Sequence, residues 1–182
     1  MDDVYIVEIA ATGPRGMPND TVAQVAVCRM YADGSDYDTV FEGHLALDPK
    51  DLGKDSLDFL ESEYGITAED LYAGDDPKTV VERFQSLVFG RECTSYDVKW
   101  TFGKFLCFEP WDTTRELTLL PSYSVRLDRS IREPEEGKNP IRKAYEATCP
   151  GDPLSVGPGN GAFELAQMSA GVMMELRKAG YF

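Results

Sequence analysis

The fold of this chain is decided by one stretch near the N-terminus, Val4-Tyr5-Ile6-Val7-Glu8-Ile9-Ala10-Ala11-Thr12-Gly13. The stretch is apolar, contains β-branched residues and is closed by Thr-Gly-Pro, so it predicts a buried first strand. One acidic side chain, Glu8, lies in the middle of this strand. A carboxylate on a buried strand is costly unless it is paired or holds a cation. Glu8 is therefore either a structural acid bonded to local donors or a group that holds a cation.

The composition is that of a soluble globular protein. The chain has 182 residues, of which 42% are hydrophobic and 27% charged, and this length favours a single domain over residues 1–182. No apolar run approaches the roughly 18 residues of a membrane span, and the N-terminal Met-Asp-Asp lacks the positive charge of a signal peptide. We therefore expect a cytoplasmic protein with no membrane partner.

Cysteine and histidine are too few and too scattered to predict a metal or nucleophile site. The cysteines, Cys28, Cys93, Cys107 and Cys149, show no Cys-x-x-Cys spacing and are expected to be free thiols in a reducing compartment. The one histidine, His44, lies on a predicted strand and is interpreted as structural. No Ser/His/Asp or Cys/His catalytic set can be assembled from these residues.

The formal net charge of −14 argues against a general affinity for nucleic acid, because phosphate-binding proteins present basic surfaces. Any such contact would have to be local. The basic residues are densest in residues 126–143: Arg126, Arg129, Arg132, Lys138, Arg142 and Lys143. Acidic residues in the same segment dilute them, so we expect weak, salt-sensitive binding to single strands or none.

The first strand is followed by two more, over residues 21–31 and 37–47, with Ala32-Asp33-Gly34 as the hairpin turn between them. Three consecutive strands with short connections predict an antiparallel meander. A fourth short strand is predicted at residues 92–96 and a fifth near Tyr123.

Helices are predicted between and after these strands. Residues 48–72 are helical in pieces, and Asp76 as cap with Pro77 at the first helical position begins the clearest helix. Two further helices are predicted over residues 97–106 and 161–178. Between them, residues 132–161 are so rich in proline and glycine that they predict a long loop.

The opening stretch resembles the first motif of the DEDD (DnaQ-like) superfamily of 3′–5′ exonucleases, which has the form Asp-x-Glu-Thr-Thr-Gly on its first strand. With Thr12-Gly13 as the anchor, Glu8 stands at the Asp position and Ala10 at the Glu position. The frame of the motif is kept, but alanine cannot bind a metal ion. Glu8 is one methylene longer than the aspartate that it replaces.

The second motif of the family, Asn-x-x-Phe-Asp, is matched by Asp97-Val98-Lys99-Trp100-Thr101. The aromatic residue is kept as Trp100, whereas Thr101 stands at the position of the metal-binding aspartate. Asp97 occupies the Asn position, and we interpret it as a helix cap.

The third motif, His-x-Ala-x-x-Asp-Ala, is matched by residues 160–166 at the start of the last predicted helix. Asn160 stands at the position of the general base and Leu165 at that of the metal-binding aspartate. The neighbouring acid, Glu164, points about 100° round the helix from Leu165 and is interpreted as a solvated helix residue.

The resemblance implies an α/β, ribonuclease H-like fold: a mixed five-stranded sheet that begins with the antiparallel meander and carries helices on both faces. In the family, four carboxylates hold two metal ions, and water attacks the phosphodiester. At the equivalent positions this chain offers Glu8, Ala10, Thr101 and Leu165. We therefore expect no metal cofactor, with Glu8 at most holding a single weak ion.

The leading hypothesis is a catalytically degenerate exonuclease-like protein that binds a protein partner or a nucleic-acid end; a homodimer is compatible with it. One alternative is an active 3′–5′ exonuclease, dependent on Mg²⁺ or Mn²⁺, with a rearranged site of Glu8, Asp97 and Glu164. Another is an acidic nucleic-acid mimic that occupies a partner protein, which rests on the net charge of −14 alone.

Overall fold

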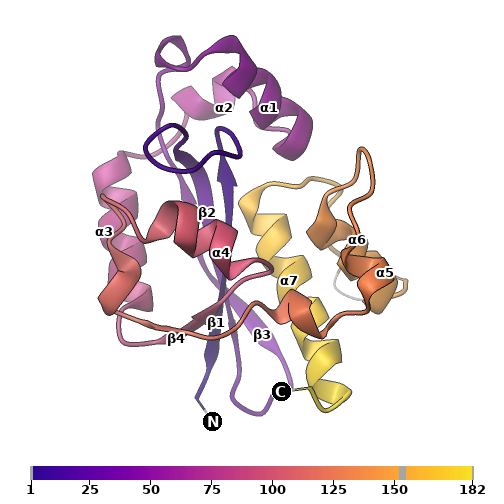
Figure 1. The fold of residues 1–182 in the computed structure, drawn as a ribbon. Coiled ribbons are helices and arrows are strands. Elements are labelled where there is room, and N and C mark those ends of the chain that lie inside the picture. Colours follow the sequence, from indigo (N-terminus) through magenta and orange to yellow (C-terminus); the bar gives the residue numbers. More distant parts are fainter. Residues whose placement is uncertain (1, 152–154, 182) are drawn as a thin grey trace.

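The computed structural model describes residues 2–151 and 155–181. It contains a five-stranded sheet in the order β3-β2-β1-β4-β5. Figure 1 labels strands β1 to β4 of this sheet, with α3 on one side of it and α7 on the other. The strands are β1 (Val4–Ala11), β2 (Val22–Met30), β3 (Tyr37–His44), β4 (Glu92–Thr94) and β5 (Thr118–Leu119). β1, β2 and β3 form the predicted antiparallel meander, and β4 and β5 extend the sheet as parallel strands. The α/β class and the mixed sheet are thus confirmed.

β1 lies at the centre of the sheet, and all of its residues are buried. Its side chains alternate between two cores, as the period of a strand requires. Ile6 belongs to the core that contains α7 (Ala162–Lys178), and Val7 belongs to the core that contains α3 (Pro77–Val88). The helices therefore cover both faces of the sheet, as predicted. By the same alternation, Glu8 faces the α7 side.

The remaining helices are α1 (Lys54–Tyr64), α2 (Ala68–Tyr72), α4 (Val98–Trp100), α5 (Arg129–Arg132) and α6 (Pro140–Thr148). The start of α3 confirms the prediction, because Asp76 accepts a hydrogen bond from the Thr79 backbone N–H at 2.9 Å and Pro77 is the first helical residue. Among the described residues, no helix is both long enough and apolar enough to cross a membrane.

The prediction of one long loop over residues 132–161 is wrong, because α6 lies inside it. Asn139 caps this helix by accepting from the backbone N–H of Ile141 at 2.9 Å, and Pro140 takes the first position. Ile141 and Ala144 are buried on its inner face. Proline and glycine on either side of the segment hid a short amphipathic helix whose start has a standard cap.

The predicted position of the fifth strand is also wrong. The strand lies at Thr118–Leu119, where β5 pairs with β4, and not near Tyr123. Tyr123 begins a 3₁₀ turn, and its side chain is fully buried. Its hydroxyl donates to the Ser169 hydroxyl oxygen at 2.6 Å. A single aromatic residue that is buried for its own contacts cannot be told from a strand residue by its local sequence.

Candidate functional site

A cleft of about 270 Å³ lies beside β1, between the end of α1 and the helices α4, α6 and α7. Three acids border it: Glu8, Glu63 and Asp97. Three aromatic rings border it as well: Tyr64, Tyr96 and Trp100. Thr101, Leu165 and the first residues of α6 complete the wall. The cleft therefore combines carboxyl groups with aromatic and aliphatic surface.

Glu8 lies at the floor of the cleft, with 2% of its surface exposed. Its Oε1 accepts hydrogen bonds from the Tyr96 backbone N–H at 2.8 Å and from the Ser169 hydroxyl at 2.8 Å. The Ser169 hydroxyl oxygen in turn accepts from Tyr123. Both groups that donate to Glu8 Oε1 are therefore uncharged, and neither of them belongs to β1.

Burial raises the pKa of Glu8 from 4.5 to about 8, against the opposing hydrogen bonds from Tyr96 and Ser169. The charge of Asp97 makes a smaller contribution to the same rise in the pKa. Glu8 is therefore mainly protonated at neutral pH. A cation entering the cleft would favour its ionised form.

The structure brings together three of the four positions that match the family's metal ligands, because Glu8, Thr101 and Leu165 border the same cleft. The fourth, Ala10, is fully buried in the hydrophobic core that also contains Leu165. Thr101 opens a π-helical segment that ends at Leu106, an irregularity often found at functional sites. The frame of the predicted site is therefore present, with apolar groups at two of its positions.

Asp97 borders the cleft and also caps α4, as predicted, by accepting from the Trp100 backbone N–H at 3.2 Å. Glu164 is not brought to Glu8 and Asp97. It lies against the segment 157–161, where a Cβ atom placed on Gly159 would be 3.1 Å from its Oε1. The set of Glu8, Asp97 and Glu164 therefore does not form one site.

Asn160, at the position of the general base, is engaged away from the cleft. Its Oδ1 accepts from Arg142 Nε at 2.8 Å. The same guanidinium donates through Nη2 to the carbonyl oxygens of Gly157 and Gly159. Arg142 thus fixes the chain that leads into α7, and Asn160 is part of that structural contact.

The residues of the cleft do not fit a pair of metal ions. Two divalent cations need several anionic oxygens converging on them. Within the part of the chain that the structure describes, no three His, Cys, Asp or Glu side chains are close enough to hold one ion.

Three features of the cleft were missed by reasoning from the sequence: Glu63, Tyr96 and the wall formed by α6. Tyr96 directly precedes the second motif, and its backbone N–H binds Glu8. Glu63 lies near the end of α1 and belongs to none of the three motifs. Tyr96 was therefore within reach of a motif, whereas Glu63 was not and the α6 wall was hidden by the predicted loop.

Most of the basic residues in 126–143 serve intramolecular contacts. Lys143 Nζ donates to the carbonyl oxygens of Ser130 and Glu133 at 3.0 and 2.9 Å. Lys138 pairs with Glu146 and Arg129 with Glu133. These three side chains are therefore engaged with oxygen atoms of the chain itself.

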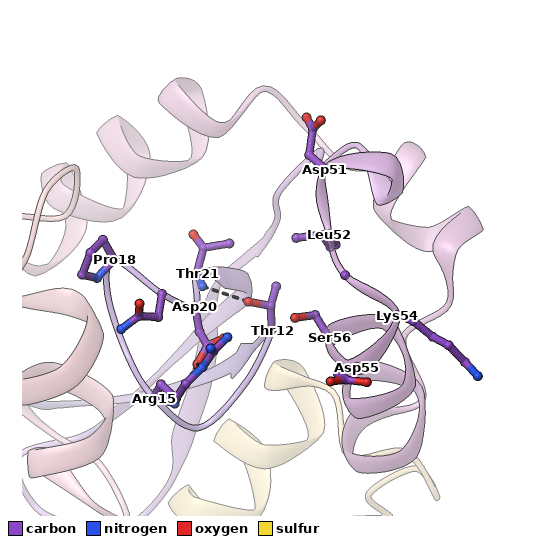
Figure 2. A pocket seen from close by; sticks show the side chains of 12 residues that line it. Thr12, Arg15, Pro18, Asp20, Thr21, Asp51, Leu52, Lys54, Asp55 and Ser56 are labelled. Carbon is purple, nitrogen blue, oxygen red and sulfur yellow. Dashed lines mark hydrogen bonds and ion pairs between the residues drawn. The ribbon is translucent and has the colours of Figure 1, made fainter.

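A second cavity, of about 480 Å³, lies between the loop after β1 and the start of α1 (Figure 2). Asp20 is 2% exposed and accepts from the Arg15 backbone N–H at 2.7 Å and from Arg15 Nη2 at 2.9 Å. Thr12 Oγ1 accepts from the Thr21 backbone N–H at 2.9 Å, the dashed line in Figure 2. Burial favours a raised pKa for Asp20, but the bonds and charge of Arg15 outweigh it and lower the pKa.

No protein-family model matches the chain, and no curated protein sequence matches it. Solved structures do. Cell-death related nuclease 4 (CRN-4) has a TM-score of 0.65 at 14% identity, over 99% of this chain and 65% of its own. E. coli exonuclease I in complex with a dA16 oligonucleotide has a TM-score of 0.68 at 13% identity, over 99% of this chain and 42% of its own. A full-length 3′-exonuclease has a TM-score of 0.63 at 16% identity, over 98% and 83%.

This chain spans 65% of the CRN-4 chain and 42% of the exonuclease I chain. At such low identity the likeness concerns the fold. The chain has the exonuclease fold that residues 4–13 predict, and the resemblance is confirmed at that level.

Proposed function

We propose that this protein is a non-catalytic binding module built on the exonuclease fold. One observation supports the proposal above others: Thr101 and Leu165 border the same cleft as Glu8, at the positions where the family carries acids. This arrangement favours a true loss of metal ligands over a misalignment of the motifs. The fold of the sheet supports the equivalence independently of the local sequence.

The chemistry of the remaining groups points the same way. In-line attack by water with two metal ions needs carboxylates that are ionised and free to bind them. Here Glu8 is buried and its Oε1 is occupied by Tyr96 and Ser169. Leu165 places an isobutyl group on the cleft wall. A hydrocarbon wall and a protonated acid suit binding better than phosphodiester hydrolysis.

The charges favour a protein partner over nucleic acid. The chain carries −14, and the lysines and arginines of residues 126–143 are largely used in internal contacts. A phosphate backbone would meet little free positive charge. A partner that presents positive or apolar groups would meet a complementary surface.

The test is a digestion of an end-labelled single-stranded oligonucleotide with Mg²⁺ or Mn²⁺. We expect no shortening beyond a buffer control, for the unaltered protein and for Glu8→Gln alike. Metal-dependent shortening that Glu8→Gln abolishes would overturn the proposal in favour of an active exonuclease with a rearranged site and a Mg²⁺ or Mn²⁺ cofactor.

A further inference from the structure

We propose that the cleft around Glu8 binds an alkylammonium group, the chemistry of a lysine side chain with or without N-methyl groups. The inference rests on the proposed function and names the ligand chemistry of the same cleft. It differs from a nucleotide site, because its ligand is positively charged. Four observations support it: aromatic walls, surplus negative charge, an unpartnered hydroxyl and size.

The three rings that line the cleft are each held in place by a second ring. The pairs, with their centroid distances, are Tyr64 with Phe59 at 6.0 Å, Tyr96 with Tyr123 at 5.7 Å and Trp100 with Phe105 at 5.1 Å. All three pairs are edge-to-face. Aromatic rings whose positions are fixed before binding can attract an ammonium ion through the ring quadrupole. Little ordering is then needed when a cation enters.

The charge at the cleft is negative, because Glu63 and Asp97 border it and none of the described residues that line it carries a positive charge. Glu8 adds a third carboxyl group, whose ionised form an entering cation would favour. Glu8 has only neutral donors on its Oε1. An ammonium ion is the simplest group that would satisfy both the rings and the acids.

Thr101 supplies an independent indication of a ligand. It is 1% exposed and borders the cleft, and its Oγ1 has no hydrogen-bond partner in residues 2–151 and 155–181. A buried hydroxyl without a partner is uncommon in a folded protein, and a bound water or ligand is one way in which it is satisfied. The N–H of an ammonium ion, or a water that accompanies it, would satisfy this oxygen.

The size of the cleft limits the ligand. Its volume of about 270 Å³ lies below the ~300–1,000 Å³ typical of pockets for drug-sized molecules. One alkylammonium group with a short chain fits that space. A single basic side chain is therefore a better occupant than a folded segment.

The test uses choline and 3,3-dimethylbutan-1-ol, which share one shape but differ in charge. Binding is followed through the indole N–H signals of the two tryptophans in NMR spectra. Trp100 lines the cleft, whereas Trp111 is 1% exposed in the core, and Trp100→Phe assigns the signals. We expect choline to shift the Trp100 signal, with an affinity at least about tenfold above that of the neutral compound.

Matched variants locate the site. Glu63→Gln removes a charge at the cleft and should weaken choline binding, whereas Glu61→Gln removes a charge from the same helix outside the cleft and should not. Equal affinities for choline and the neutral alcohol, or no change in the Trp100 signal, would overturn the inference. If the nuclease digestion is still negative in that case, the proposed function survives without this ligand. Nuclease activity would instead remove the proposed function itself.

A second arm identifies the source of the ammonium group. The probes are Nα-acetyl-lysine methylamide, its Nε-trimethyl derivative, choline and spermidine. Tighter binding of either lysine compound would assign the site to a protein side chain. Tighter binding of choline or spermidine would assign it to a small free ammonium compound. Both results support an alkylammonium site, and the absence of binding by all four contradicts it.

Discussion

Asp20 and Glu8 carry two carboxyl groups that are buried to the same extent, each residue being 2% exposed, yet they differ in the kind of group that bonds to them. Asp20 has its cation within the chain, because Arg15 Nη2 lies 2.9 Å from its Oδ1. Glu8 has only neutral donors, the Tyr96 N–H and the Ser169 hydroxyl. The pKa of Asp20 is accordingly lowered and that of Glu8 raised to about 8.

Both acids border a hollow, so the difference between them lies in their partners. Asp20 lines the cavity of about 480 Å³, and Glu8 lines the cleft of about 270 Å³. The loop after β1 packs closely against Asp20, since a Cβ atom placed on Gly13 would lie 2.6 Å from Asp20 Oδ1. Asp20 has a cation from its own chain, whereas Glu8 has none among the residues that bond to its Oε1.

The largest expected effect concerns the pH dependence of stability. Between pH 4.5 and about 8 the folded protein holds a proton on Glu8 that the unfolded chain has released. Stability should therefore fall as pH rises through this window, by up to about 1.4 kcal/mol per pH unit and a few kcal/mol in all, and level off above it. Glu8→Gln keeps the shape without the titration, so urea unfolding at pH 5 and pH 8.5 should show a smaller loss in the variant. Equal slopes for both proteins would mean that Glu8 is ionised when folded.

Asp20→Asn should lower the free energy of unfolding by about 2–3 kcal/mol at pH 7, because it breaks a buried charge-assisted network. The control is Arg15→Ala, whose side chain is 65% exposed. Urea titration of both variants checks the comparison. If Arg15→Ala lowers the free energy of unfolding as much as Asp20→Asn does, Arg15 provides most of the stabilisation of the buried Asp20 carboxylate. The backbone N–H groups that donate to Asp20 then contribute little.

The smallest expected effect concerns two buried threonines. As with the two acids, one side chain has a partner within the chain and the other lacks one, but here both groups are uncharged. Thr113 Oγ1 donates to the Leu106 carbonyl oxygen at 2.7 Å, whereas Thr101 Oγ1 has no partner among the described residues. Thr113→Val should cost about 1–2 kcal/mol of unfolding free energy, and Thr101→Val should be within about 0.5 kcal/mol of the unaltered protein. Thermal unfolding of the pair measures the difference. A large loss at Thr101 would show that a bound water already serves it.

Much of the fold was predictable because its signals are local. The alternation along β1, the turn after β2 and the cap at Asp76 each lie within a few residues. The motif positions also met as expected, since Glu8 on a strand and Leu165 on a helix keep the faces that their periods assign. A register error of one residue would have moved Glu8 to the other core.

The parts that the sequence did not predict depend on distant partners. Arg142 holds Asn160 across 18 residues, and nothing in the local pattern names that acceptor. Tyr123 resembled a strand residue because its hydroxyl partner, Ser169, is 46 residues away. The group of Tyr96 that donates to Glu8 is its backbone N–H, so the identity of the side chain at position 96 does not predict this hydrogen bond. Contacts made by backbone groups, or across the fold, are invisible to periodicity.

The hydrogen bonds of Glu8 also bear on the order of assembly during folding. Its two donors lie 88 and 161 residues further along the chain. The β1–β2–β3 meander can form from neighbouring contacts, but the surroundings of this carboxyl group need the last helix. Non-local contacts of this kind form slowly, because a long loop must close first. During synthesis Glu8 therefore emerges well before Ser169 and stays hydrated until α7 docks, so the loss of water from this one group marks the completion of the native state.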